Sequence, residues 1–242
     1  MGEPTIPPAS VHAYAETPPP EPWTPWREAH FCVVDLETTG LNPGDDEIVA
    51  FAALHIARGQ VRLDDAVYQL VRPRRMPGRE TVVIHGLRSA DLIAAPDFGE
   101  TQNRLLEALA GRSMVAHVAS IETKFLGAAL GKSGITLHNP VIDTEALAAE
   151  LFHRRNLVGP RPLALGQVAD TLGLPVHRPH EADGDALTTG QVFLALATHL
   201  DEFSPQTVGS LEKLSRHWTR ERVPSRPFRR WFSRLIAPRS RR

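Results

Sequence analysis

The chain has 242 residues, of which 42% are hydrophobic and 23% charged; this composition allows one ordinary domain with extensions and excludes a globally disordered chain. The only cysteine, Cys32, excludes an internal disulfide and a zinc knuckle, so we expect a cytoplasmic protein. No run of about 18 apolar residues occurs, and the N-terminus lacks a basic start before an apolar core, so we expect neither a transmembrane helix nor a secretory signal.

Charge is unevenly distributed along the chain, although the net charge is only −1. Residues 216–242 contain ten arginines and a single acid, Glu221, whereas the remainder of the chain has more acids than bases. An acidic body favours metal binding, and a basic tail favours contact with a polyanion or a protein partner.

The N-terminal segment, residues 1–26, contains eight prolines, including Pro18 to Pro20. Such a composition cannot bury a core, so it predicts an extended, disordered arm. We expect the folded domain to occupy residues 27–203 and a basic tail to occupy residues 204–242.

The next part of the chain predicts three strands, followed by alternating helices and strands. The first strands are predicted at His30 to Asp35, Glu47 to Ala57 and Ala66 to Val71. The later strands are predicted at Ser113 to Ala116 and Val141 to Ile142. Helices are predicted at Phe98 to Ala110, Ile121 to Leu130, Leu163 to Leu172 and Ala186 to Leu200, and a further helix through Leu147 and Leu151 is capped by Asp143 or Thr144. This order predicts a mixed α/β sheet covered by helices.

Two carboxylates follow the first buried strand, in the sequence Asp35-Leu36-Glu37. Residues two apart on a strand face the same side, so both carboxylates project together. Like charges at this spacing repel unless a cation lies between them. The pair alone is weak evidence, because salt-bridged acids on a surface give the same pattern.

Two further clusters contain acids and a histidine. Glu122 lies in the first turns of a helix, where an acid is also favoured by the helix dipole. His180 precedes the last long helix and Asp185 begins it, so the two side chains can converge on one point. The alternatives are a surface loop histidine and a helix cap, respectively.

Taken together, these clusters resemble the motifs of the DnaQ-like (DEDDh) 3′→5′ exonucleases, best known from the epsilon proofreading subunit of DNA polymerase III. The sequence from Val34 to Leu41 resembles the first motif, and that from His180 to Leu187 resembles the third. The segments Ile84 to Leu87 and Val141 to Thr144 also resemble recurring family segments. The family fold is ribonuclease H-like, a mixed five-stranded sheet flanked by helices.

The resemblance implies hydrolysis at single-stranded nucleic-acid 3′ ends, with release of nucleoside 5′-monophosphates. It implies two divalent metal ions, Mg²⁺ or Mn²⁺, and His180 as the general base. The expected metal ligands, which are also catalytic residues, are Asp35, Glu37, Glu122 and Asp185. The expected substrate-binding residues are Thr38, Thr39, Leu41 and His85. We interpret Asp143 as a structural helix cap.

Two positions depart from the family pattern, which usually has Asp where this chain has Glu122 and Asn where it has Val118. Glutamate extends the carboxylate by one methylene, and valine removes a polar group near the substrate. An alternative interpretation is therefore a catalytically weakened or inactive nucleic-acid-binding module on the same fold. A second alternative is an exoribonuclease, because no residue visibly selects for or against the 2′-hydroxyl.

The basic tail contains an apolar stripe with helical spacing between Phe228 and Ile236, with arginines on the other face. An amphipathic helix this short requires a partner to be stable. The candidate partners are nucleic acid, a polymerase or other protein, and an anionic membrane surface.

Overall fold

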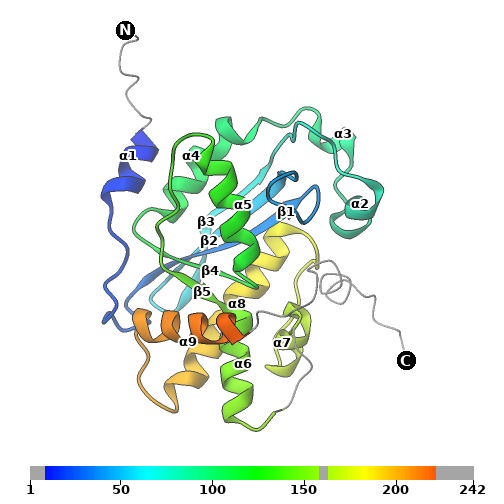
Figure 1. Cartoon of the computed structure of the whole chain (residues 1–242). Coiled ribbons are helices and arrows are strands. Elements are labelled where there is room, and N and C mark those ends of the chain that lie inside the picture. Colours follow the sequence, from blue (N-terminus) through cyan, green and yellow to red (C-terminus); the bar gives the residue numbers. More distant parts are fainter. Residues whose placement is uncertain (1–8, 158–162, 222–242) are drawn as a thin grey trace, which may run out of the picture.

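A computed structural model describes residues 9–157 and 163–221. Its centre is a five-stranded sheet with the strand order β3-β2-β1-β4-β5 (Figure 1). The strands are β1 His30–Thr38, β2 Ile48–Ala57, β3 Gln60–Leu70, β4 Ser113–Ala116 and β5 Val141–Asp143. The first three form an antiparallel meander, and β4 and β5 continue parallel to β1. The predicted mixed α/β sheet is confirmed.

Helices cover both faces of this sheet (Figure 1). They are α1 Ala9–Glu16, α2 Arg79–His85, α3 Ser89–Leu92, α4 Phe98–Leu109, α5 Ser120–Gly131, α6 Thr144–Arg154, α7 Leu165–Thr171, α8 Ala182–Asp201 and α9 Val208–Glu221. Helices α6 to α9 contribute to the core on one face, and α1, α4 and α5 contribute to the core on the other.

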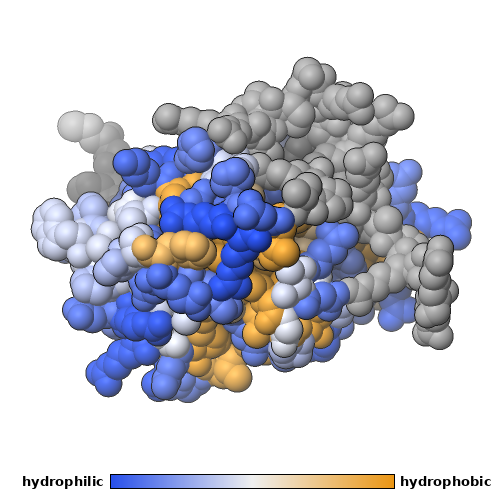
Figure 2. Space-filling view, turned by 90° about the horizontal axis from the view of Figure 1, so that it is seen from below, coloured by the Kyte–Doolittle hydropathy of each residue, from blue (hydrophilic) through white to orange (hydrophobic). Residues whose placement is uncertain are grey.

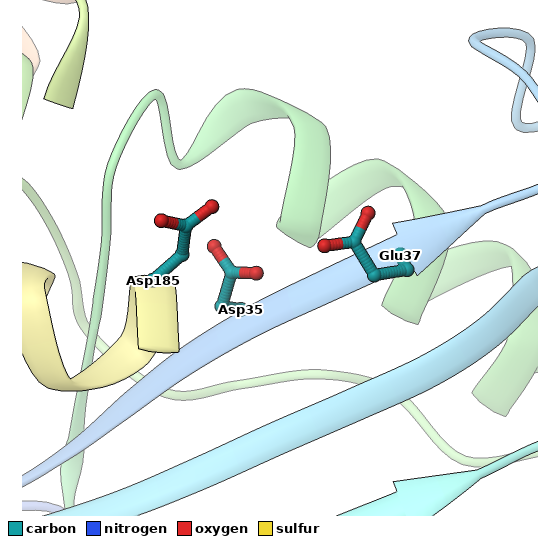
Figure 3. A group of neighbouring side chains, drawn as sticks. All are labelled: Asp35, Glu37 and Asp185. Carbon is teal, nitrogen blue, oxygen red and sulfur yellow. The ribbon is translucent and has the colours of Figure 1, made fainter. Parts of the chain in front are cut away.

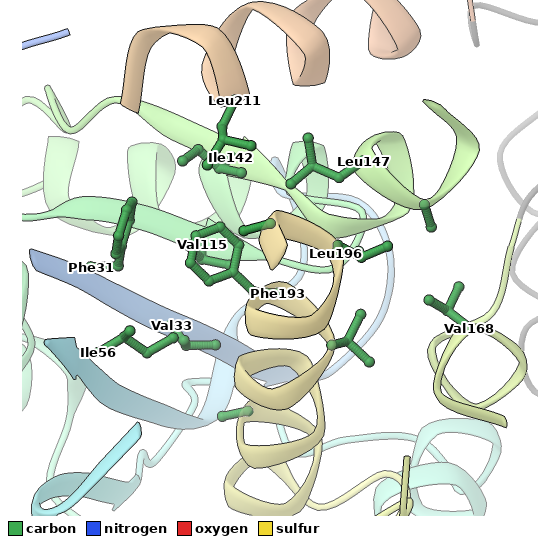
Figure 4. Packing of buried hydrophobic residues seen from close by; sticks show 14 of the residues in the cluster. Phe31, Val33, Ile56, Val115, Ile142, Leu147, Val168, Phe193, Leu196 and Leu211 are labelled. Carbon is green, nitrogen blue, oxygen red and sulfur yellow. The ribbon is translucent and has the colours of Figure 1, made fainter. Parts of the chain in front are cut away.

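Strand β1 divides its side chains between the two cores because successive residues point to opposite faces. Phe31 and Val33 pack against α8, where Phe193 and Leu196 are fully buried (Figure 4). Cys32 and Val34 pack in the opposite core. Burial on both faces explains why β1 is apolar without interruption from Phe31 to Val34.

The N-terminal segment differs from the disordered arm that its prolines predicted. Residues 9–16 form α1, where Tyr14 is buried and its hydroxyl donates to Asn139 Oδ1 at 2.6 Å. Trp26 is also buried, and its indole N–H donates to Asp201 Oδ2 at 2.9 Å. The prediction was wrong for residues 9–26 because two aromatic side chains anchor a segment whose prolines only restrict its conformation.

The predicted domain boundary at residue 203 is also corrected. Helix α9 packs on the body, with Val208 and Leu211 buried. Ser215 Oγ accepts a hydrogen bond from the backbone N–H of Asp143 at 2.8 Å, and the Trp218 indole donates to Glu150. The basic composition concealed the apolar face of this helix. The predicted amphipathic helix near residues 228–236 lies outside the described residues.

Several helices and strands were not predicted from the sequence or were predicted too short. Helices α2 and α3 have only 7 and 4 residues, too few for an apolar period to appear. Strand β3 begins at Gln60, whereas the predicted strand began at Ala66. The first half of this edge strand is exposed and includes Asp64 and Asp65, so it lacks the apolar residues that predict a strand. Helix α8 begins at Ala182 rather than at Ala186.

The described surface is mostly hydrophilic when viewed from below, with hydrophobic residues visible in patches (Figure 2). Among residues 9–157 and 163–221, no helix has the combination of length and apolar character needed to cross a membrane.

Candidate functional site

The candidate site lies at the end of β1, where the N-terminus of α8 approaches it (Figure 3). Asp35 and Glu37 continue the row of Phe31 and Val33, so they project from the face that α8 covers. Leu36 points to the opposite core. The strand alternation therefore sends both carboxylates to one side, as the sequence predicted.

Asp185 completes the group from the first turn of α8, with its carboxylate directed toward Asp35 (Figure 3). Asp35, Glu37 and Asp185 each offer one oxygen atom, and these atoms lie within 4.8 Å of one another. A Cβ on Gly184 would lie 2.5 Å from the carbonyl oxygen of Arg178, and one on Gly190 would lie 3.3 Å from Val61 Cγ2. Both glycines therefore let α8 lie close to its neighbours.

Glu122 lies outside this group of three in the described part of the chain. It is buried in the first turn of α5, with 5% of its surface exposed. Its Oε2 atom has no hydrogen-bond partner among the described residues. A buried, unpartnered carboxylate oxygen is costly, and a cation or its bound water would satisfy it.

The four carboxylates have raised pKa values. Burial is the largest cause for Asp35, and the nearby charges of Asp185, Glu37 and Glu122 raise its pKa further. Burial also raises the pKa of Glu37, Glu122 and Asp185, the last to about 6. Anions that are both buried and mutually repulsive form a site for a hard divalent cation, which prefers oxygen ligands.

These shifts predict an unusual pH dependence for the protein in a chelator. A carboxyl whose pKa is higher in the folded than in the unfolded chain binds an extra proton when folded, so stability falls as pH rises. The loss begins near the unfolded pKa of about 4 and, for Asp185, runs through about 6. The melting temperature measured in EDTA should therefore fall across this range.

The Asp35→Asn variant tests this repulsion directly. In EDTA at pH 8 it should melt above the wild type, since relief of about 1 kcal/mol corresponds to roughly 2–4 °C in a chain of this size. At pH 4 the difference should largely disappear, because the carboxyl is protonated. A difference in melting temperature between the two proteins that is the same at every pH would contradict the prediction.

His180 lies directly before α8, and its ring is half-buried. Its backbone N–H donates to Asp185 Oδ2 at 2.9 Å, which fixes the histidine beside the acid group. Burial lowers the pKa of its imidazole, so the ring favours the neutral form. The backbone of His180 thus lies at the Asp185 carboxylate, and the convergence of the two side chains stays a prediction.

An open cleft of about 1610 Å³ is lined by the loop after β1, by the helices α2 and α5, and by His180. Thr39 and Leu41 line it, together with Ile84, Phe125 and Lys124. The loop is braced by the Asp46 carboxylate, which accepts hydrogen bonds from the Thr39 hydroxyl and from the Asn42 backbone. Apolar side chains and the histidine thus line the same cleft, whereas Asp35, Glu37, Glu122 and Asp185 are not among its lining residues.

Thr38 and His85 do not line the cleft. The Thr38 hydroxyl donates to the Gly40 carbonyl at 2.6 Å, so it shapes the turn. His85 is buried at 6% exposure, its Nδ1 accepts from the Leu87 backbone N–H, and burial lowers its pKa. Its Nε2 has no hydrogen-bond partner among the described residues.

Asp143 caps α6, in line with its structural interpretation. Its Oδ1 atom accepts from the Glu145 backbone N–H at 3.0 Å and from that of Val118 at 2.9 Å. Val118 has a φ of 63°, in the left-handed region that costs a β-branched residue more than it costs asparagine. This strain gives a physical reason why asparagine suits this position in the family pattern.

Two residues beside the site were missed in the sequence. Arg178 forms ion pairs with Glu181 and Asp183, the two additional acids of the His180 segment. Tyr68 on β3 stands opposite Ala52, which stands opposite Asp35, so the three share one face. The opposite charges of Arg178, Glu181 and Asp183 are close together in the sequence and could have been noticed, whereas the strand register that places Tyr68 could not be read from it.

Residues 32–193 match the model of the exonuclease family RNase_T. The chain is 34% identical over 188 residues to a PolC-type DNA polymerase III of Thermotoga maritima, with 77% of this chain and 13% of that protein covered. It is 32% identical over 191 residues to a DNA polymerase III subunit epsilon-like protein of Rhodobacter capsulatus, with coverages of 78% and 26%. The chain therefore spans a small part of the length of these relatives.

Among solved structures, exonuclease X in complex with 5′ overhanging duplex DNA matches with a TM-score of 0.58 at 21% identity. The match covers 76% of this chain and 99% of that chain. It confirms the predicted ribonuclease H-like fold class.

Proposed function

Because the chain belongs to the RNase_T exonuclease family, we propose that it is a metal-dependent 3′→5′ exonuclease acting on single-stranded DNA ends. Each cycle would hydrolyse the terminal phosphodiester bond and release one nucleoside 5′-monophosphate. The observation that carries this proposal is the meeting of Asp35, Glu37 and Asp185, with the backbone of His180, a residue that also lines the cleft, bound to Asp185.

The acid group fits divalent cations such as Mg²⁺ or Mn²⁺ in charge and in donor type. Asp35, Glu37 and Asp185 would hold them, and Glu122 would contribute directly or through water from its buried oxygen. Two bound cations would stabilise charge on the attacking and leaving oxygens. The raised carboxyl pKa values support this role, because cation binding relieves the repulsion.

His180 would accept the proton of the attacking water on an unprotonated ring nitrogen. A general base must be neutral at the working pH, and burial of the imidazole favours that form. The hydrogen bond from its backbone to Asp185 would keep the ring at a fixed place relative to the acid group.

The cleft would receive the 3′-terminal nucleotides. Thr39 and Leu41 would contact the last nucleotide through backbone groups and an apolar side chain, which gives little sequence preference. Lys124 and Arg79 also line the cleft and would attract the phosphate backbone. Thr38 would support the turn that follows β1 through its hydroxyl, and His85 would act behind this surface beside the Thr38 backbone.

The proposal is tested by incubating the protein with end-labelled single-stranded DNA and RNA oligonucleotides, each with Mg²⁺, Mn²⁺ or EDTA. We expect nucleoside monophosphates to appear one at a time from the 3′ end of DNA, and only with a divalent cation. Faster release from RNA would make the protein an exoribonuclease. Release in EDTA would contradict the proposed chemistry.

A second candidate function is a weakened or inactive nucleic-acid-binding module. The position of Glu122 outside the close acid group favours it, because misplacement by about 1 Å can cost about 10²-fold in rate. A titration with Mn²⁺ separates the two candidates. A binding module would retain DNA in the cleft without turnover at any Mn²⁺ concentration, whereas an enzyme would show saturable turnover.

The biological partner is a further proposal. Relatives named as DNA polymerase III proteins support association with a polymerase, and the free, buried Cys32 is compatible with a cytoplasmic location. The basic tail beyond residue 221 lies outside the described residues. Its proposed contacts with nucleic acid, a protein or a membrane surface are tested by comparing binding of each to the full chain and to residues 1–221.

A further inference from the structure

The loop that carries His180 is held in a strained conformation. Arg178 has a φ of 24° and His180 a φ of 65°, both in the region that favours glycine. A backbone conformation of this kind is unfavourable and persists only where surrounding contacts enforce it. The contacts that enforce this conformation therefore decide where the imidazole lies.

Backbone contacts anchor the loop at both ends. The His177 N–H donates to Thr188 Oγ1 and the His180 N–H to Asp185 Oδ2, at 3.0 and 2.9 Å. The carbonyls of residues 177 and 178 lie where a Cβ on Gly184 would be, at 2.6 and 2.5 Å from it. These contacts fix the loop against α8. Two side chains of the loop add further links, His177 to Gln191 Oε1 and Arg178 to the acids at the start of α8.

The Arg178 guanidinium binds two carboxylates that lie on either side of the start of α8. Its Nη1 atom lies 3.2 Å from Glu181 Oε2, and its Nη2 atom contacts Asp183 Oδ2. Glu181 follows His180 directly in the sequence. The planar guanidinium of Arg178 thus links a residue that precedes His180 to two residues that follow it, Glu181 and Asp183.

The same ion pairs act on the charge of the site. The charge of Glu181 raises the pKa of both Glu37 and Asp185, so this acid lies within electrostatic reach of the metal-binding group. Tyr68 faces the cluster from β3 and has a raised pKa, mainly because of burial; the charges of Asp183, Glu37 and Glu181 raise it further and that of Arg178 lowers it. Without Arg178, the site would border two uncompensated anions.

We propose that Arg178 is a positioning residue that holds His180 in place by binding Glu181 and Asp183 together. Its catalytic consequence rests on the proposed exonuclease function. A different role would be compensation of the negative charges of Glu181 and Asp183, which requires a nearby positive charge but no particular position of His180. The two roles make different predictions when the acids are neutralised.

The test compares Arg178→Ala with the triple variant Arg178→Ala, Glu181→Gln, Asp183→Asn. If Arg178 positions His180, Arg178→Ala lowers kcat by about 10²-fold, as expected for a displacement of about 1 Å, and the triple variant stays low. Arg178→Lys should recover only part of the rate, because a lysine lacks the fork. Arg62→Ala removes a comparable exposed pair with Asp64 and should leave kcat unchanged.

Two outcomes of the kinetic test would overturn the proposal. One is a kcat for Arg178→Ala at the wild-type level. The other is recovery of kcat in the triple variant, which would reduce Arg178 to charge compensation. Thermal melting of each variant shows whether the fold is retained, and Arg178→Lys carries the test if Arg178→Ala does not fold.

Nuclear magnetic resonance of the histidine rings tests the positioning without turnover. The His180 signal, identified by its absence in His180→Gln, should be a single sharp resonance in the wild type. It should broaden or move in Arg178→Ala and remain unchanged in Arg62→Ala. An unchanged His180 signal in Arg178→Ala would refute the positioning role. Because this measurement needs no turnover, it separates failure of the positioning role from failure of the proposed exonuclease function.

Discussion

Replacement of Asp35 by Asn should lower the rate of mononucleotide release by about 10³-fold or more. Asp35 lies between Glu37 and Asp185 in the acid group (Figure 3), and the amide removes one anionic oxygen ligand while preserving the shape of the side chain. Bound cations contribute several kcal/mol to stabilising the transition state, and each 1.36 kcal/mol corresponds to about tenfold in rate. The measurement is the initial rate with a labelled single-stranded substrate in Mg²⁺.

The control for this change is Asp64→Asn. Asp64 is an exposed acid on β3 that pairs with Arg62, so its loss should leave the rate near that of the wild type. Melting in EDTA should show that Asp35→Asn is folded and more stable than the wild type at pH 8. A folded Asp35→Asn protein that releases mononucleotides at the wild-type rate would contradict the role of the acid group.

Replacement of His180 by Gln should lower kcat by about 10²–10⁴-fold, the range for loss of a general base. Glutamine keeps a polar side chain and the backbone N–H that donates to Asp185, so the loop and the acid group should be retained. KM should change little, because the imidazole acts on the water rather than on binding of the ground state.

The matched control is His12→Gln, which changes an exposed histidine of α1 that pairs with Glu16. Its kcat should equal that of the wild type. Binding of labelled DNA in Ca²⁺ should be the same for His180→Gln and for the wild type. A large loss of DNA affinity with an unchanged kcat would assign His180 to substrate binding instead.

The pattern of apolar and charged residues along the sequence predicted those parts of the fold that depend on neighbouring residues. The uninterrupted apolar run before Asp35 identified β1, and the spacing of Asp35 and Glu37 identified a shared face. The segment from His180 to Asp185 was placed at the start of a long helix, and α8 does begin within it, at Ala182. Each of these inferences used residues near one another in sequence.

The remaining features depend on contacts between distant residues. The buried Tyr14 donates a hydrogen bond to Asn139, and the buried Trp26 donates one to Asp201. A proline-rich composition does not reveal either partner. The position of Tyr68 opposite Ala52 depends on strand register, and the outlying position of Glu122 depends on how α5 packs. Pairing and packing of this kind are set by tertiary structure.

Anomalous diffraction from crystals soaked in Mn²⁺ measures most directly whether the acids from β1 and α8 hold a cation. The account predicts a Mn²⁺ peak among the Asp35, Glu37 and Asp185 oxygens, at about 2.1 Å as for small hard cations, and loss of this peak in Asp35→Asn. Saturating Mn²⁺ with no peak at these oxygens, in crystals of a protein that degrades DNA, would contradict it.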